Sequence, residues 1–201
     1  MTTPADPRPL YRQALHWTAS VMAAVRTDQW SNPTPCSEFD ARTLAGHLVA
    51  TVDRVRVIGE GGDPLSVALV ADGIPDNALS QSYRQAAHRL GEIWDDDAIL
   101  DEVLTAPWGR ISGREAVWAY PNETLVHGWD LAVATGQRSE ADPELAETML
   151  VAAYEAIPET PRGQHIPFDA VVRPRDDAGP TERLANWSGR DSTLWLNRQP
   201  S

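Results

Sequence analysis

Residues 123–132 read Glu-Thr-Leu-Val-His-Gly-Trp-Asp-Leu-Ala, an apolar segment that also carries a glutamate, a histidine and an aspartate. In an α-helix, residues three or four apart lie on the same face, so Tyr120, Glu123, His127 and Leu131 form one stripe. Glu123 and His127 are one turn apart, which lets a carboxylate and an imidazole point at a single atom. The segment therefore predicts a helix with paired polar groups on one face.

Apolar residues on either side recur with helical spacing and predict further helices. The long helices are expected at about Leu10–Val25, from Asp40 to about Gly59, at Asn77–Trp94, at Arg114–Ala134 and from Asp142 to about Ala156. Asp40 and Asp142 are suitable N-caps. Gly136 suits the position just past a helix end, where a left-handed backbone is common. The segment Ile99–Ile111 is expected to form a short hairpin or an extended loop, and Thr181–Trp187 a short helix.

This pattern predicts an all-α protein, a four-helix bundle with an extra helix and an irregular C-terminal segment. A single domain is expected over residues 1–201, with the bundle at about 8–158. The Pro-, Arg- and Asp-rich segment at about 159–201, which includes Leu194-Trp195-Leu196, is expected to pack back on the bundle.

The composition excludes several classes of protein. The 201 residues include 17 Lys and Arg against 29 Asp and Glu, a formal net charge of −12. Such a surface repels phosphate backbones and anionic lipid heads, so neither nucleic acid nor a membrane is expected as a partner. Cys36 is the single cysteine, which excludes an internal disulfide and suits a reducing compartment. The N-terminus lacks the apolar core of a signal peptide and no apolar run approaches the ~20 residues that span a bilayer, so we expect a cytoplasmic protein.

Only some of the histidines face the bundle interior. His47 lies three residues after Leu44 and four before Thr51, so it borders the apolar stripe of its helix. It could therefore supply a third ligand to the pair Glu123 and His127. The other histidines lie off the apolar stripes or in the Pro-rich segment: His16, His88 and His165.

Two imidazoles and a carboxylate suit a divalent metal, zinc in the first place and nickel or ferrous iron as alternatives. Three protein ligands leave a coordination position for water or substrate, which is typical of catalytic rather than structural sites. Asp130, three residues beyond His127, is placed to orient an imidazole. Tyr120 and Asp130 are the candidate catalytic residues. The competing interpretation is a surface Glu–His pair together with a hydrogen-bonded core histidine.

Pro121 and Cys36 each allow two interpretations. Pro121 either interrupts a helix beside Glu123 or stands in the first turn of a helix that begins there. Cys36 is either a nucleophile or fourth ligand, or a small buried residue. The second is favoured, because nothing in its surroundings, with Glu38 and Asp40 nearby, would lower the pKa of its thiol.

Three segments carry a further signal: Thr34–Arg42 with Leu44–Val49, Glu123–Ala132 with Ala134-Thr135-Gly136, and Arg183-Leu184 with Ser188-Gly189-Arg190-Asp191. They resemble the DinB-like superfamily, specifically its actinobacterial metal-binding branch related to mycothiol-dependent maleylpyruvate isomerase. The resemblance implies a bundle in up-down-down-up order. It also implies a metal held by one histidine on the second helix and a pair of ligands on a later one, at the positions of His47, Glu123 and His127.

The resemblance further implies the use of a low-molecular-weight thiol, mycothiol in actinobacteria. We therefore expect a mycothiol-dependent transferase or isomerase, monomeric or homodimeric, in which the metal activates a thiolate toward an electrophilic substrate. Arg54 and Arg56 follow His47 and either contact an anionic group or lie on a solvated face. The alternatives are a metal-dependent hydrolase that activates water with help from Tyr120 or Asp130, and a non-catalytic metal-binding stress-response protein.

Overall fold

The computed structural model describes residues 6–163 and 168–197, so His165 lies outside the described residues. The helices are α1 (Arg8–Ala23), α2 (Ala41–Gly59), α3 (Leu79–Trp94), α4 (Gly113–Ala134), α5 (Pro143–Ala156), α6 (Pro180–Trp187) and α7 (Ser192–Leu196). Short 3-10 helices lie at Thr27–Gln29, Pro64–Ser66, Asp76–Ala78 and Asp97–Leu100. Strands β1 (Val103–Ala106) and β2 (Gly109–Ser112) pair antiparallel. Of the two structures expected for this segment, a short hairpin or an extended loop, the hairpin is therefore the one that forms. The predicted all-α class is confirmed.

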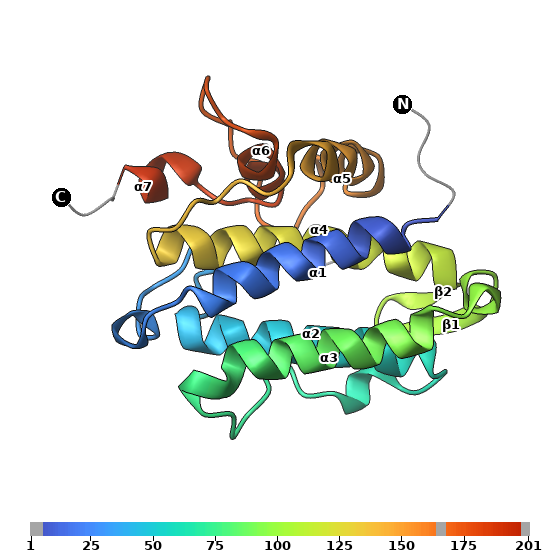
Figure 1. The fold of residues 1–201 in the computed structure, drawn as a ribbon. Helices are drawn as coiled ribbons and strands as arrows, with labels where there is room; N and C mark the ends of the chain where they lie inside the picture. The colour runs from blue at the N-terminus through green and yellow to red at the C-terminus, as the bar shows by residue number, and fades with distance from the viewer. Residues whose placement is uncertain (1–5, 164–167, 198–201) are drawn as a thin grey trace.

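The helices α1 to α4 form a bundle in two layers (Figure 1). α1 packs along α4, α2 packs along α3, and α2 also contacts α4. The chain passes along α1 in one direction, along α2 and α3 in the opposite direction, and along α4 in the first direction again. The bundle therefore has the up-down-down-up order that the resemblance implied.

Because α2 and α3 are parallel, the chain between them has to come back along the bundle. Residues 60–78 do so and are called the return segment below. Near the end of α2, Arg54 donates a hydrogen bond to the carbonyl of Ala68 at 3.1 Å. Near the start of α2, Arg42 donates to the carbonyl of Ile74 at 2.8 Å. The return segment thus lies against α2 and runs antiparallel to it.

Gly46 allows the return segment to approach α2 closely. A Cβ atom at this position would lie 2.9 Å from Cγ1 of Val70, closer than real contacts permit, and at a tight 3.1 Å from the carbonyl oxygen of Ala71. The main-chain N–H of Ala71 donates to the carbonyl of Gly46 at 3.1 Å. A residue without a side chain is therefore required where the two backbones meet.

Local sequence rules set most helix ends. The side chains of Asp40 and Asp142 cap α2 and α5, as predicted. Gly136 follows α4 with φ of +67°, the left-handed conformation expected there. α1 begins and ends two residues earlier than the apolar spacing predicts, and at its start Asp6 accepts a hydrogen bond from the N–H of Arg8 at 3.0 Å.

α4 continues through Pro121 without a break from Gly113, so the interpretation of this proline as a first-turn residue is wrong. Proline has no N–H, so the carbonyl of Val117 lacks its usual helical donor four residues further on. This interruption of the helical hydrogen bonds lies just before the candidate ligands Glu123 and His127. The helix begins instead with a capping box, in which the side chains of Ser112 and Glu115 bond each other's backbone N–H groups.

The tryptophans inside helical patterns contribute to the core. Trp94 and Trp129 are buried, and Trp17 and Trp118 are partly buried and pack against the buried residues. The indole N–H of Trp94 donates to the carbonyl of Val55 at 3.1 Å, which ties α3 to α2. These rings therefore pack in the core together with many aliphatic side chains.

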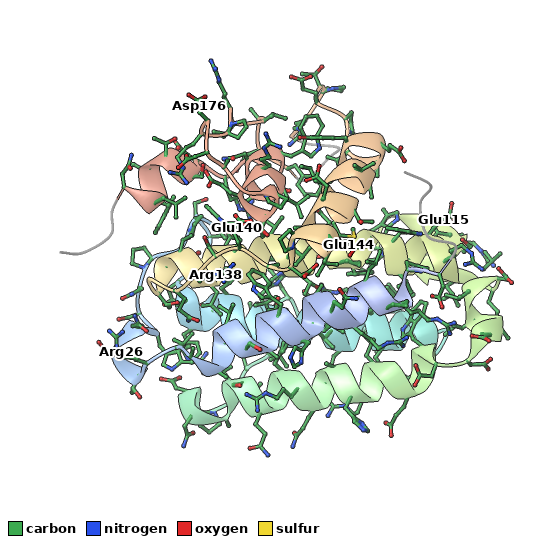
Figure 2. The ribbon with its side chains drawn as sticks, turned by 45° about the horizontal axis from the view of Figure 1, so that its top comes forward. Arg26, Glu115, Arg138, Glu140, Glu144 and Asp176 are labelled. Atoms are coloured by element: carbon green, nitrogen blue, oxygen red, sulfur yellow. The ribbon has the colours of Figure 1, made fainter. Side chains whose placement is uncertain are left out.

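α5 and residues 168–197 cover α4 on the side that faces away from α2 and α3, and are called the C-terminal layer below. α6 packs against α4 and α5, and α7 contacts α4 and α6 (Figure 1). Gly179 offers no side chain to cap α6, and Glu140 takes this role from the segment before α5. Its carboxylate accepts hydrogen bonds from the N–H groups of Thr181 and Glu182, each at 3.0 Å (Figure 2). Residues 168–197 are thereby fastened to the bundle.

Charged side chains project around the periphery, as Arg26, Glu115 and Asp176 do in Figure 2. Among the described residues, no helix combines the length and the apolar character needed to cross a membrane. The buried polar residues include His47 and Thr51 on α2 and His127 and Asp130 on α4.

Candidate metal centre

The structure brings together the three residues that the sequence singled out as metal ligands. One ligand atom from each of His47, Glu123 and His127 lies within 4.8 Å of the other two. Nε2 of His47 is 3.3 Å from Oε1 of Glu123. The two imidazole rings are nearly perpendicular, with 5.1 Å between their centroids. α2 supplies one ligand and α4 supplies two, one turn apart. By contrast, His16 and His88 are exposed, as expected.

The orientation of His47 is fixed by the return segment. Its Nδ1–H donates a hydrogen bond to the carbonyl oxygen of Leu69 at 2.9 Å. This leaves Nε2 directed toward Glu123, available as a ligand atom. The ring of Phe39 packs at 5.1 Å from the imidazole centroid and covers another side of it. The position of His47 is therefore held by a main-chain group and an aromatic ring.

The orientation of His127 is fixed from within α4. Its Nδ1–H donates to Oδ2 of Asp130 at 3.0 Å, which leaves Nε2 as the free ring nitrogen. Asp130 is fully buried, with 0% of its surface exposed. Burial raises the pKa of this carboxyl, but the charge of Arg190 and the bonds from His127 and Arg190 outweigh burial and lower the pKa overall. An ionised carboxylate behind a ligating imidazole is a common arrangement at zinc sites.

Glu123 supplies the negative charge of the set. Burial raises the pKa of its carboxyl, but the hydrogen bond from His47 and the charges of His127, His47 and Arg54 lower it below its usual value. Thr51 Oγ1 also donates to Oε1 of Glu123 at 3.4 Å. The side chain keeps 35% of its surface exposed, whereas both histidines are buried. The centre is therefore open to solvent on the side of Glu123.

This donor set fits a divalent cation. Each imidazole has its Nδ1–H engaged outside the centre, so loss of any proton on Nε2, which metal binding requires, leaves a lone pair directed inward, and the carboxylate is ionised at neutral pH. Metal coordination would also offset the cost of placing a charged glutamate between helices. The three ligands and the open side match the pattern of sites that keep a position for water or substrate.

Tyr120 and Arg54 lie near Glu123, and Trp108 packs against Tyr120. The hydroxyl of Tyr120 is buried and has no hydrogen-bond partner among the described residues, and burial together with Glu123 raises the pKa of the phenol. The ring of Trp108, at the tip of the hairpin, lies 5.7 Å from that of Tyr120 and remains 57% exposed. Arg54 lies close enough to Glu123 and Tyr120 for its charge to lower the pKa of both. The position of Trp108 beside Tyr120 could not be predicted from the sequence, because it depends on how the hairpin packs in the fold.

The two arginines after His47 differ in their surroundings. Arg56 forms ion pairs with Asp53 and Glu60 along α2, which agrees with a solvated face. Arg54 instead donates to the carbonyl of Ala68 and lies close enough to Glu123 for its charge to lower the pKa of that carboxyl. Only Arg54 is therefore placed to contact an anionic group at the centre.

Cys36 lies behind His127, a placement that sequence reasoning missed. Its sulfur lies within 4.8 Å of ligand atoms of His127 and Asp130, but does not close a set with His47 and Glu123. Burial raises the pKa of the thiol, and the opposing charge of Arg190 does not compensate for it. A protonated thiol beside a guanidinium is a poor cation ligand. The favoured interpretation of Cys36 as a packed, unreactive residue agrees with this environment.

The fold and the site together define a helical-bundle protein with a candidate metal centre between α2 and α4. The family model described as "Mycothiol maleylpyruvate isomerase N-terminal domain" matches residues 11–132, and the chain belongs to this family. This match confirms the relationship that the sequence motifs indicated, and it contains the three candidate ligands and Asp130.

Two curated proteins of Mycobacterium tuberculosis are also similar to the chain, one from strain CDC 1551 / Oshkosh and one from strain H37Rv. Each is 33% identical over 187 residues, which cover 92% of this chain and 98% of the relative. Both are named only as uncharacterized proteins. No solved structure gives a significant match.

Proposed function

We propose that the chain is a divalent-metal-dependent enzyme that acts on a low-molecular-weight thiol, as a thiol transferase or isomerase. The observation that carries this proposal is the open side of the three-ligand set, where Glu123 reaches solvent and both histidines are held from behind. The family is named after an isomerase that uses mycothiol, and this supports a thiol as the co-substrate.

His47, Glu123 and His127 would hold the metal, for which zinc is the first candidate and nickel or iron the alternatives. When bound, the ion would supply Lewis acidity that lowers the pKa of a thiol and favours the thiolate. Leu69 and Asp130 keep the imidazoles in place through their hydrogen bonds. An electrophilic small molecule would approach from the side of Glu123.

The residues around the open side have different roles in this proposal. Tyr120 keeps its proton at neutral pH, so its hydroxyl can donate a hydrogen bond to a substrate oxygen. The charge of Arg54 suits an anionic group on the substrate or on the thiol. Asp130, the other candidate catalytic residue, has its oxygens occupied by His127 and Arg190, which supports a positioning role instead.

The test is an assay of the metal-loaded protein with mycothiol and a panel of electrophiles. We expect thiol consumption that is lost in His47→Ala and kept in His88→Ala, which removes an exposed histidine of α3. The proposal is wrong if wild-type protein consumes thiol no faster than His47→Ala. Turnover of an ester or amide without thiol would indicate a hydrolase, and stoichiometric metal without any turnover would indicate a non-catalytic metal-binding protein.

A further inference from the structure

α6 ends in a turn that fixes the position of Arg190. The N–H of Gly189 donates to the carbonyl of Asn186 at 3.0 Å, and the N–H of Arg190 donates to the carbonyl of Ala185 at 2.9 Å. This pair of bonds defines a Schellman motif. Gly189 has φ of +93°, which the motif requires and which glycine adopts without strain. The side chain of Asn186 also donates to the carbonyl of Arg190 at 2.8 Å.

From this turn the guanidinium of Arg190 reaches Asp130 on α4. Nε donates to Oδ1 at 3.1 Å, and Nη2 donates to Oδ2 at 3.0 Å. A two-pronged contact of this kind fixes the plane of a carboxylate as well as its position. Nη1 donates to the carbonyl of Ser188 at 3.3 Å, so the guanidinium itself is held in place.

Oδ2 of Asp130 accepts hydrogen bonds from both Arg190 and His127. The carboxylate therefore cannot turn away from Arg190 without also breaking or bending the hydrogen bond that sets the orientation of the His127 ring. The chain of contacts runs from the C-terminal layer through Asp130 to a candidate ligand. It begins outside residues 11–132, the part of the chain that the family model matches.

We propose that Arg190 is a positioning residue of the metal centre, which fixes the ring of His127 through Asp130 and makes the C-terminal segment part of the metal site. The inference rests on the metal centre of the proposed function. It extends that function by adding a segment that contributes no ligand.

The pair Arg175 and Glu182 provides a matched control. Arg175 also contacts a buried carboxylate with two prongs, Nε to Oε1 and Nη2 to Oε2 of Glu182, each at 2.8 Å. Both residues lie in the same C-terminal layer, and neither contacts a candidate ligand. Loss of this pair should disturb the layer to a similar extent without a direct path to His127.

The experiment compares Arg190→Met, Arg190→Lys, Asp130→Asn, the double variant Arg190→Met/Asp130→Asn, and Arg175→Met. Cobalt affinity is measured by competition with a chelator, and the visible cobalt spectrum reports the ligand geometry. We expect Arg190→Met to bind cobalt about tenfold more weakly with an altered spectrum, in the range found when groups that orient metal ligands are removed. Arg175→Met should match wild type, and the double variant should match Asp130→Asn alone, because the effect passes through Asp130.

Arg190→Lys keeps the positive charge but not the two-pronged contact with Asp130. It tests the positioning role of Arg190 if Arg190→Met does not fold. An intermediate loss of affinity is expected for it. In metal-free protein, the Nδ1 proton of His127 should be protected from exchange with water in wild type and in Arg175→Met, and exposed in both Arg190 variants. Wild-type affinity and protection in those variants, or an equal loss in Arg175→Met, would overturn the inference. Absence of cobalt binding by wild type would instead contradict the metal centre itself. The exchange of the Nδ1 proton would then show separately whether Arg190 fixes the ring of His127.

Discussion

Glu123 is the only anionic member of the candidate ligand set, and its position one turn before His127 places it there. Glu123→Gln keeps the size of the side chain but removes the charge, so we expect cobalt or zinc affinity to fall at least about a hundredfold. Elemental analysis after dialysis and chelator competition would measure this. Glu92→Gln is the control, because Glu92 faces His88 four residues away on the exposed side of α3. An equal loss in both variants would show that the metal binds to surface carboxylates.

Asp130 links stability to pH in the metal-free protein. Its pKa is lowered in the fold from the ordinary value of 3.8, so the ionised carboxylate stabilises the native state. This stabilising contribution is complete above pH 3.8. It is lost as the pH falls from 3.8 through the lower pKa that Asp130 has in the folded protein. Urea unfolding between pH 2 and 6 should therefore show a steeper loss for wild type than for Asp130→Asn. Parallel profiles for the two proteins would contradict this prediction.

At the scale of elements, the return segment holds His47 only because it lies close to α2. Gly46→Ala would force Val70 and Ala71 outward, and we expect a loss of about 1–3 kcal/mol in unfolding free energy. Metal affinity should fall as well, because the carbonyl of Leu69 moves with the segment. Gly91→Ala in α3 is the control, since no atom lies within 4 Å of the Cβ it adds. It should be neutral or stabilise by up to about 1 kcal/mol.

The elements themselves could largely be predicted from the sequence. Helical spacing placed α1 to α5 within a few residues, and the caps at Asp40 and Asp142 followed from local chemistry. The convergence of His47 with Glu123 and His127 could also be predicted, because it depends on which face each residue occupies. The signals in these cases lie within one helix or its first turn.

Asp130 could be predicted as the group that orients His127, because it lies three residues further along the same helix, but the other groups that hold the ligands in place could not. Leu69 acts through a main-chain carbonyl, which has no sequence signature. Arg190 reaches Asp130 across 60 positions of the chain, and neither residue carries a pattern that pairs it with the other. Trp108 and Cys36 likewise acquire their neighbours from the packing of distant segments.

At the scale of the whole molecule, a metal at this centre would join α2 to α4 and stabilise the fold. Ligand binding to the native state at a free concentration of 100 Kd adds about 2.7 kcal/mol to the unfolding free energy. Thermal unfolding with zinc and with a chelator should show this difference for wild type. We expect no such difference for Glu123→Gln, and an unchanged zinc effect in that variant would mean that the metal binds elsewhere.

The main-chain bond from Leu69 to His47 has a consequence for how the site can diversify. A carbonyl oxygen is present whatever residue occupies position 69, and the side chain of Leu69 is 60% exposed. Substitutions at position 69 can therefore change the surface beside the centre while the histidine keeps its support. Such substitutions leave the close approach of the return segment to α2 unchanged, provided that Gly46 stays small.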